Sequence, residues 1–219
     1  MAKKKEQIPV MQNAKEISGL HFTMEHTGKM RGMYSISTSC KLNQRCARNA
    51  EVKGSICEKC YAQRMASMYK NMEAPLANNF KILTKEIVPM EKLPFINACY
   101  FRIESFGDLS TVIQARNYIR LIKKNPHVFF GWWTKNPDLL KKAIEIEGKP
   151  ENVKIIRSSM FINKPQKPGY DFVDAVFTVY DEDTIKAKEI NINCGARSCL
   201  ICGKCYRKGG DVYINEKLK

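Results

Sequence analysis

Eight of the nine cysteines in this 219-residue chain fall into two groups of four. The N-terminal group has the spacing C-x5-C-x10-C-x2-C and consists of Cys40, Cys46, Cys57 and Cys60. The C-terminal group is tighter, with the spacing C-x4-C-x2-C-x2-C, and consists of Cys194, Cys199, Cys202 and Cys205. Reduced thiols gathered in this way are typical metal ligands, so each group predicts a metal site.

The spacing of the C-terminal group favours iron and sulfide over zinc. Structural zinc sites usually pair two C-x2-C knuckles that lie a dozen or more residues apart, and this group lacks that arrangement. Its C-x2-C-x2-C core is closer to the ferredoxin run that wraps a [4Fe–4S] cluster. Gly195, Ala196 and Gly203 would let backbone N–H groups approach the sulfur atoms. We therefore expect an iron–sulfur cluster, with zinc as the alternative.

The N-terminal group is less regular, and its number of ligands decides what it can do. Four cysteine ligands would make a closed structural or electron-carrying site. Three would leave one metal coordination position open to a substrate or cofactor, as catalytic metal sites do. The ninth cysteine, Cys99, falls inside an expected strand, where a small buried thiol is the expected role.

The elements that must position these thiols alternate between strands and helices. The pattern predicts strands at 35–39, 95–104, 128–134, 153–158 and 175–180, with helices at 60–71, 75–88, 111–125 and 137–148. Ser110 is the expected N-cap of the third helix. This order predicts an α/β fold, either a partial (β/α) barrel or an open parallel sheet of about five to six strands, with cysteine-rich metal-binding segments at both ends. We expect an N-terminal extension (1–34), an α/β core with the first cysteine group (35–183) and a C-terminal cysteine segment (184–219).

Polar residues follow the expected strands, where the chemistry of such sheets gathers. Glu104, Asp108 and Lys135 are the candidate catalytic residues. The candidate cofactor-binding residues are Gly107, Asp108, Arg157 and Ser158.

The chain is strongly basic, with 37 Lys and Arg against 22 Asp and Glu and a net charge of +15. Such a charge attracts nucleic acid, although the lysines are spread along the chain and no nucleic-acid-binding motif is present. The aromatic residues that could stack on bases, if they are exposed, are Trp132, Trp133, Tyr61 and Tyr206. No apolar run is long enough to span a bilayer and no signal peptide is evident, which predicts a cytoplasmic protein without a membrane partner.

Four motifs together resemble phage-encoded proteins of the gene-product-88 type. They are a cysteine group ending in CYA, then SFGDLS, then WTKNP, and a terminal C-x2-C-x2-CY segment, and they extend from about Ser35 to Tyr206. The resemblance implies a phage protein that binds iron and sulfide in the cytoplasm of a bacterial or phage-infected host cell.

A fainter likeness links the chain to radical S-adenosylmethionine (SAM) enzymes. In those enzymes a three-cysteine loop after the first strand holds a [4Fe–4S] cluster whose open iron binds SAM, and an acidic segment ends the second strand. Here Phe106-Gly107-Asp108-Leu109 is similar to that segment, although the usual C-x3-C-x2-C loop is absent. The likeness implies that Asp108, Glu104, Lys135 and Arg157 line the ligand pocket.

Three functional hypotheses follow. The first is an iron–sulfur redox enzyme of radical-SAM-like build, with a catalytic N-terminal cluster, an auxiliary C-terminal cluster and a small-molecule ligand or electron donor as partner. The second is a non-catalytic iron–sulfur protein for electron transfer or structural support. The third is a zinc-stabilised nucleic-acid-binding protein.

Overall fold

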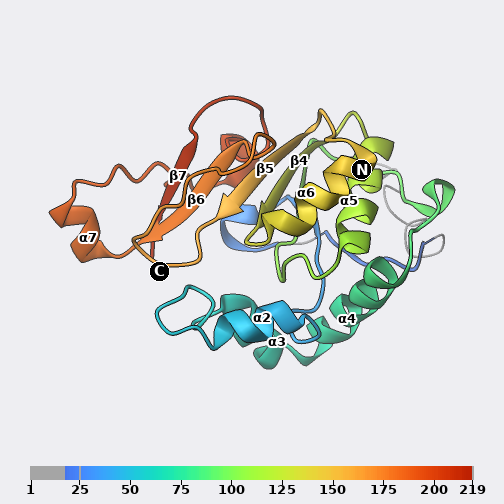
Figure 1. Ribbon diagram of the computed structural model, residues 1–219, viewed down its shortest axis with the longest axis horizontal. Coiled ribbons are helices and arrows are strands. Elements are labelled where there is room, and N and C mark those ends of the chain that lie inside the picture. Colours follow the sequence, from blue (N-terminus) through green and yellow to red (C-terminus); the bar gives the residue numbers. More distant parts are fainter. Residues whose placement is uncertain (1–17, 25, 219) are drawn as a thin grey trace, which may run out of the picture.

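The protein is built around one seven-stranded sheet (Figure 1). A computed structural model describes residues 18–24 and 26–218. The strands follow the chain order from β1 to β7; β1 (Phe22–Thr23) runs antiparallel to β2 (Tyr34–Ile36), and every other neighbouring pair is parallel. The remaining strands are β3 (Tyr100–Ile103), β4 (Phe129–Thr134), β5 (Val153–Ser158), β6 (Ala175–Tyr180) and β7 (Tyr213–Lys217).

The prediction of an α/β fold with an open, mostly parallel sheet is confirmed. The sheet is open because β1 and β7 are its two edges, so it does not close into a barrel. It has seven strands instead of five or six. The two strands that the sequence pattern missed are these edges: β1 has two residues, and β7 (YINEK) has a polar sequence with weak strand signals.

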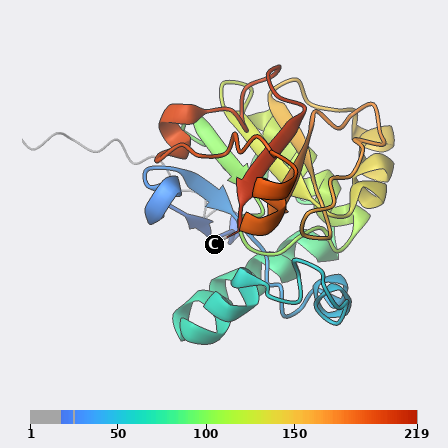
Figure 2. The same ribbon diagram turned by 90° about the vertical axis from the view of Figure 1, so that its left-hand side faces the viewer.

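Helices connect most of the strands. They are α2 (Gln44–Ala50), α3 (Tyr61–Met68), α4 (Lys70–Lys85), α5 (Val112–Lys124), α6 (Pro137–Glu147), α7 (Glu182–Ala187) and α8 (Cys199–Cys202), with 3-10 turns η1 (Gly28–Met30) and η2 (Met90–Lys92). Both ribbon views place α2, α3 and α4 below the sheet (Figures 1 and 2).

Two expected helix boundaries were wrong. The chain breaks at Tyr69, which is extended, so α4 begins at Lys70 and carries Pro75 in its interior. The N-cap of α5 is Thr111, not Ser110, because the Thr111 hydroxyl accepts a hydrogen bond from the Gln114 N–H at 3.0 Å. Side-chain capping of this kind satisfies a helix N–H that has no partner within the helix.

The expected strand at 95–104 is shorter than predicted and begins only at Tyr100. Before it, the Ile96 N–H donates to the Asn125 side chain at 2.7 Å instead of joining the sheet, and the exposed Phe95 ring stacks on His127. Cys99 therefore lies outside the strand and is exposed, which corrects the expectation of a buried thiol.

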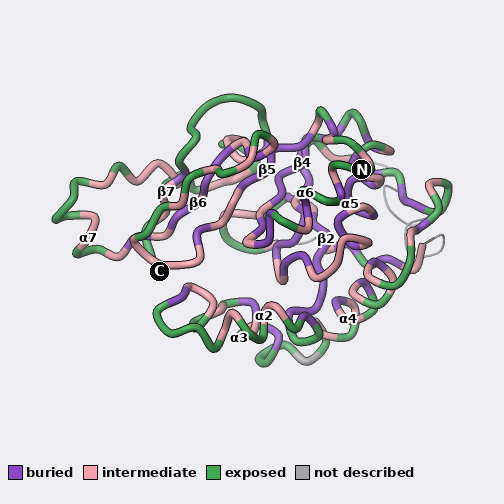
Figure 3. Tube along the Cα trace, in the orientation of Figure 1, coloured by how far each residue is buried: buried purple, intermediate pink, exposed green. Residues whose placement is uncertain are grey.

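The main core lies between the sheet and helices α4, α5 and α6. Sequential strand order with right-handed crossovers places successive helices on the same face of a parallel sheet. The side chains that fill this core are Phe101, Ile103, Phe130, Trp132, Val153 and Ile155 from the strands, with Leu83, Tyr118, Ile119 and Leu140 from the helices. Figure 3 shows the buried residues concentrated along the central strands. Trp132 is fully buried here, while Trp133 points to the other face and is half-buried.

That other face, which we call the cysteine face, is covered by the C-terminal segment. Its side chains alternate with those of the main core and belong to Tyr100, Arg102, Trp133, Lys154 and Ile156, with Gly131 among them. The residues Cys194, Cys199, Cys205 and Tyr206 pack against it. The short helix α8 lies beside η1 near the edge of this face (Figure 2).

The two ends of the chain join the same sheet. The described part of the 1–34 extension supplies β1, residues 1–17 lie outside the described residues, and the 184–219 segment supplies β7. Among the helices described, none combines the length and apolar character needed to cross a membrane.

Gly131 allows the C-terminal segment to lie directly on the sheet. A Cβ atom at this position would lie 2.8 Å from the Cys205 carbonyl oxygen, 2.8 Å from the Tyr206 ring and 2.9 Å from the Trp133 ring. We expect Gly131→Ala to lower the free energy of unfolding by about 1–3 kcal/mol, because a backbone carbonyl must move to make room. Urea unfolding measures this change.

The matched control is Gly195→Ala in the same segment, where an added Cβ meets nothing within 4 Å. Equal destabilisation by the two substitutions would contradict the close packing of the segment on the sheet.

Candidate metal centres

Three of the four C-terminal cysteines, Cys194, Cys199 and Cys205, pack on the cysteine face. Cys202 is exposed, and the other three are half-buried. Cys199 and Cys205 pack beside Met33, Tyr100 and Tyr206. Short local structure brings the thiols together: Ser198 caps α8 by accepting from the Ile201 N–H, and Gly203 ends it in the left-handed conformation.

Burial makes three of these thiols, Cys194, Cys199 and Cys205, hard to ionise. Burial raises the pKa of Cys205 to about 12, with further increases from the neighbouring Cys194 and Cys199. Burial is also the main reason why the pKa values of Cys194 and Cys199 are raised. Thiols that lie close enough to affect one another need a positive charge among them before they can become thiolates together.

Two cations lie at this group, the half-buried Arg102 and the buried Lys154. The Arg102 guanidinium stacks over the Trp133 ring at 4.3 Å, its Nη1 atom lies 3.4 Å from the Met30 sulfur, and its buried Nε atom has no hydrogen-bond partner. Lys154 is 1% exposed. Within residues 18–24 and 26–218, neither cation forms an ion pair with a carboxylate. A buried cation without a counter-ion is costly, so the face is suited to an anionic group.

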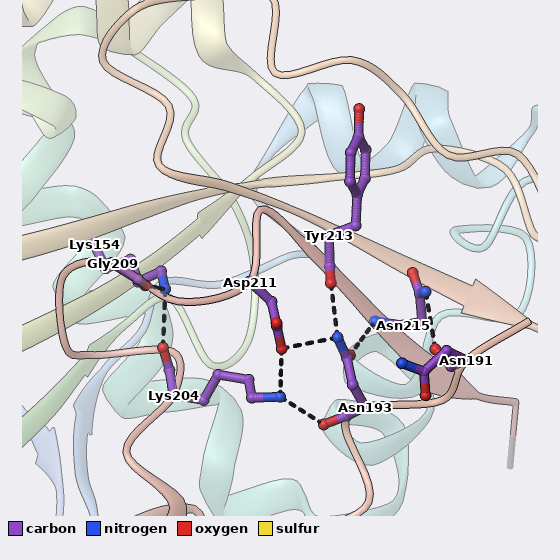
Figure 4. Close-up of polar contacts among 8 residues, drawn as sticks. All are labelled: Lys154, Asn191, Asn193, Lys204, Gly209, Asp211, Tyr213 and Asn215. Carbon is purple, nitrogen blue, oxygen red and sulfur yellow. Dashed lines mark hydrogen bonds and ion pairs between the residues drawn. The ribbon is translucent and has the colours of Figure 1, made fainter.

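Lys154 also takes part in the hydrogen-bond network that fixes the C-terminal segment. Figure 4 shows its ammonium group donating to the carbonyl oxygens of Lys204 at 3.1 Å and Gly209 at 2.7 Å. The Lys204 ammonium pairs with Asp211 at 2.6 Å and donates to the Asn193 carbonyl at 3.1 Å. These contacts hold the residues that flank Cys194 and Cys205 against β7.

Lys29 adds a third cation from η1. Its ammonium donates to the Cys194 carbonyl oxygen at 3.1 Å and pairs with Glu216 at 3.0 Å. Segments from both ends of the described chain therefore meet at this centre, which sequence spacing alone could not indicate.

The N-terminal cysteines lie at the carboxyl end of the sheet, in the loop that leaves β2. Asn43 caps α2 through its side-chain oxygen and donates its amide to the Asp108 carbonyl at 2.8 Å. Further along, the Ile56 N–H donates to the Met160 carbonyl at 2.9 Å, so the loop reaches across to the segment after β5. Tyr61 then anchors the end of the loop, donating its hydroxyl to the Ser105 carbonyl.

The surroundings of this second group are acidic. Cys40 is buried, and burial raises its pKa to about 11, with smaller increases from Cys60 and Glu73. The pKa of Cys46 is also raised, first by burial and then by Asp108 and Glu104. Burial raises the pKa of Cys57 as well, but Lys135 opposes that change. This group therefore has mainly carboxylates around it, in contrast to the cations of the cysteine face.

Glu104 is a hydrogen-bonding centre beneath the N-terminal group. Its buried carboxylate accepts from the Thr38 hydroxyl at 2.7 Å and N–H at 3.1 Å, from the Gln114 amide at 2.7 Å and from the Tyr118 hydroxyl at 2.7 Å. Its backbone has a left-handed φ of 55°, which is uncommon outside glycine. Glu104 thereby joins the loop after β2 to helix α5.

Asp108 plays a similar role between β3 and β4. Its carboxylate accepts from the Leu109 N–H at 2.7 Å, the Thr134 hydroxyl at 2.6 Å and the Lys135 N–H at 2.8 Å. Gly107 precedes it with a φ of 91°, and a Cβ atom there would lie 2.7 Å from the Thr38 carbonyl oxygen.

The structure brings some of the predicted site residues together and not others. Glu104, Gly107, Asp108 and Lys135 lie with the N-terminal cysteines, as the strand-end argument expected. Arg157 instead donates to the Lys167 carbonyl at 2.9 Å in the loop after β5, and Ser158 ends β5 half-buried. The sequence analysis missed Arg102 and Lys154. The sequence did contain a sign of these two residues, because each is a charged residue inside an otherwise apolar strand. Arg102 lies in YFRI and Lys154 in VKII.

The geometry of the two cysteine groups is not that of a formed metal site. In the described part of the chain, no group of three or more His, Cys, Asp or Glu side chains is arranged so that it could hold a metal ion. Ligation would require the sulfur atoms of each group to turn toward a common point. Two observations support an anionic metal–thiolate group on the cysteine face. The Arg102 Nε atom has no hydrogen-bond partner, and Lys154 donates only to carbonyl oxygens, without a carboxylate as counter-ion.

Burial of Glu104 predicts a specific pH dependence of stability. Burial raises its pKa from 4.5 to about 8, so between these pH values the folded chain holds a proton that the unfolded chain releases. The free energy of unfolding should therefore fall as the pH rises through this window, by at most about 1.4 kcal/mol per pH unit. Glu104→Gln, which cannot titrate, should lack this slope in urea unfolding measured from pH 4.5 to 8.

Glu91→Gln, at an exposed carboxyl group, is the control and should keep the slope of the natural chain. Parallel profiles for the natural chain and Glu104→Gln would show that Glu104 does not titrate in this window.

Comparison with known proteins identifies the family. The model of the family described as Gene product 88 matches residues 2–211. No curated protein and no protein of solved structure matched the chain. The likeness to radical SAM enzymes finds no support in these comparisons and stays a hypothesis. Because the match spans almost the whole sequence, the chain belongs to the Gene product 88 family.

Proposed function

We propose that this protein is an iron–sulfur protein that holds a [4Fe–4S] cluster on its cysteine face through Cys194, Cys199, Cys202 and Cys205. The observation that carries the proposal is a pair of cations without carboxylate partners, the half-buried Arg102 and the buried Lys154, beside the C-terminal cysteine group. Four thiolates around a [4Fe–4S] core carry a net negative charge, and that charge would supply the counter-ion that both cations lack.

A zinc ion with four thiolates would also be anionic, so charge alone does not select the metal. The spacing selects it: C-x2-C-x2-C is closer to ferredoxin runs than to paired zinc knuckles. For the zinc-stabilised nucleic-acid binder, two of the four aromatic residues expected to stack on bases are buried: Trp132 and Tyr206 are 0% and 2% exposed. Tyr61 is exposed and Trp133 is half-buried, so stacking would depend on these two rings.

The C-terminal centre suits electron transfer or structural support better than catalysis. Four cysteine ligands occupy every iron of the cluster, so no iron is left for a substrate. When bound, the cluster supplies one-electron chemistry. The chain supplies a largely buried setting, cationic side chains and one exposed ligand, Cys202.

A second proposal concerns the N-terminal group, which has the position expected of a catalytic centre. Cys40, Cys46 and Cys60 lie at the carboxyl end of a parallel sheet, where ligands bind in such folds. Three ligands would leave one iron open to a small molecule, with SAM as the radical-SAM-like candidate. Asp108 and Glu104 hold the loops around that position, and Lys135 lies beside Cys57.

Metal analysis of the anaerobically purified chain tests both proposals. We expect about eight iron and eight sulfide atoms per chain if both groups hold a cubane cluster, and about four of each if only the C-terminal group does. Cys205→Ser should remove about four iron atoms, because it breaks a four-ligand site. Cys99→Ser, at the exposed cysteine outside both groups, should remove none.

Zinc in place of iron and sulfide would overturn the iron–sulfur proposals. Low-temperature EPR of the dithionite-reduced protein, before and after addition of SAM, tests the open iron. A changed signal would support the second proposal. An unchanged signal from a chain with two clusters would leave the electron-transfer or structural role.

The role of Arg102 gives an independent prediction. Arg102→Met should lower the reduction potential of the C-terminal cluster, because a nearby cation favours the more negative reduced state. A redox titration followed by EPR measures the potential. Arg197→Met removes the same charge from an exposed position in the same segment and should leave the potential nearly unchanged. Equal shifts in both variants would show that Arg102 acts only through overall charge.

A further inference from the structure

A pocket of about 460 Å³ lies between α2, α4 and the start of α6. None of the eight grouped cysteines lines it. Its polar wall includes Arg45 and Arg48 of α2 with Asn136 and Asp138 at the start of α6, while Leu42 and Phe80 contribute apolar surface. Arg45 and Arg48 share one face of α2, since residues three apart on a helix are neighbours.

Asn136 lines this pocket and carries a hydrogen-bond acceptor that no other group uses. The residue is 1% exposed. Its amide nitrogen donates to the Leu109 carbonyl at 3.2 Å, and its backbone N–H donates to the Thr134 hydroxyl at 2.8 Å. The Leu109 contact fixes the orientation of the amide, because a carbonyl can only accept. The Oδ1 atom is left buried without a partner, and leaving such an atom unsatisfied costs about 1–3 kcal/mol.

The two arginines supply unpaired positive charge. In the described residues, neither Arg45 nor Arg48 forms an ion pair with a carboxylate. The buried Nε atom of Arg45 also has no hydrogen-bond partner. Asp138, the acidic residue of the wall, accepts instead from the Tyr170 hydroxyl at 2.5 Å. Guanidinium groups without carboxylates are well suited to bind a carboxylate or phosphate of a ligand.

We propose that this pocket binds a small molecule that carries an anionic group beside a hydrogen-bond donor. The carboxylate or phosphate would lie at Arg45 and Arg48. A neighbouring hydroxyl or amino group would donate to the Asn136 Oδ1 atom, and a short apolar part would contact Leu42 and Phe80. This proposal requires no metal and stands apart from the iron–sulfur proposals.

Isothermal titration calorimetry of the full-length chain tests the proposal with two matched pairs of probes. L-lactate and propionate differ by the hydroxyl beside a carboxylate, and glycerol 1-phosphate and propyl phosphate differ by hydroxyl groups near a phosphate. We expect at least one hydroxyl-bearing probe to bind saturably and more tightly than its partner. The pair that binds identifies carboxylate or phosphate as the preferred group.

The variants locate the binding. Arg45→Gln and Arg48→Gln should each weaken binding at least tenfold, since each removes a charge-assisted contact. Lys142→Gln, at an exposed lysine of α6 outside the pocket, removes the same charge and should leave the affinity unchanged. Arg48 is exposed, so its variant should fold even if the Arg45 variant does not. The proposal is overturned if no probe binds, if the hydroxyl gives no advantage, or if Lys142→Gln weakens binding as much as Arg48→Gln.

Discussion

Two cations on one face of the sheet, one buried and one half-buried, set the main constraint on this structure. Arg102 on β3 and Lys154 on β5 lie on either side of β4, and Gly131 of β4 is the register partner of both. A cation removed from water must gain hydrogen bonds and a counter-ion, or the fold loses stability. Carbonyl oxygens of the C-terminal segment satisfy part of this need for Lys154. The negative charge of a metal–thiolate group would supply the counter-ion. The C-terminal segment would then stabilise the cations of the sheet, and the cations would stabilise the group that the segment holds.

The two cysteine groups differ in their electrostatic surroundings, and this difference suggests that they have different functions. The C-terminal thiols lie among Arg102, Lys154 and Lys29, a setting that stabilises an anionic group already complete in its ligands. The N-terminal thiols lie near the Asp108 carboxylate and the Glu104 carboxyl group, whose pKa burial raises to about 8. Asp108 and Glu104 accept so many hydrogen bonds that they also fix the loops around the thiols. A closed electron-carrying site on one face and a ligand-accepting site at the strand ends are consistent with this contrast.

Sequential strand order explains how both sites fit on one small sheet. Helices α4, α5 and α6 cover one face, which leaves the opposite face for residues that arrive from both ends of the chain. The carboxyl ends of the parallel strands form a third region, where the loop after β2 crosses toward the segment after β5. Helix α2 in that loop carries Cys46 together with Arg45 and Arg48, the two arginines that line the pocket.

Local sequence determined the elements whose signals are short in range. The strands FFGWWT, VKIIRS and AVFTVY and helix α6 (Pro137–Glu147) follow from propensity, alternation and capping. The cysteine spacing predicted two metal-binding groups, which stays a prediction. The edge strands β1 and β7 were missed because short or polar strands are stabilised by their neighbours and carry little pattern of their own. The burial of Lys154, the partial burial of Arg102, the hydrogen bonds of Glu104 and the unpaired oxygen of Asn136 were decided only by tertiary structure. Each depends on contacts between residues far apart in the chain, and desolvation is a property of the folded surroundings that no local spacing encodes.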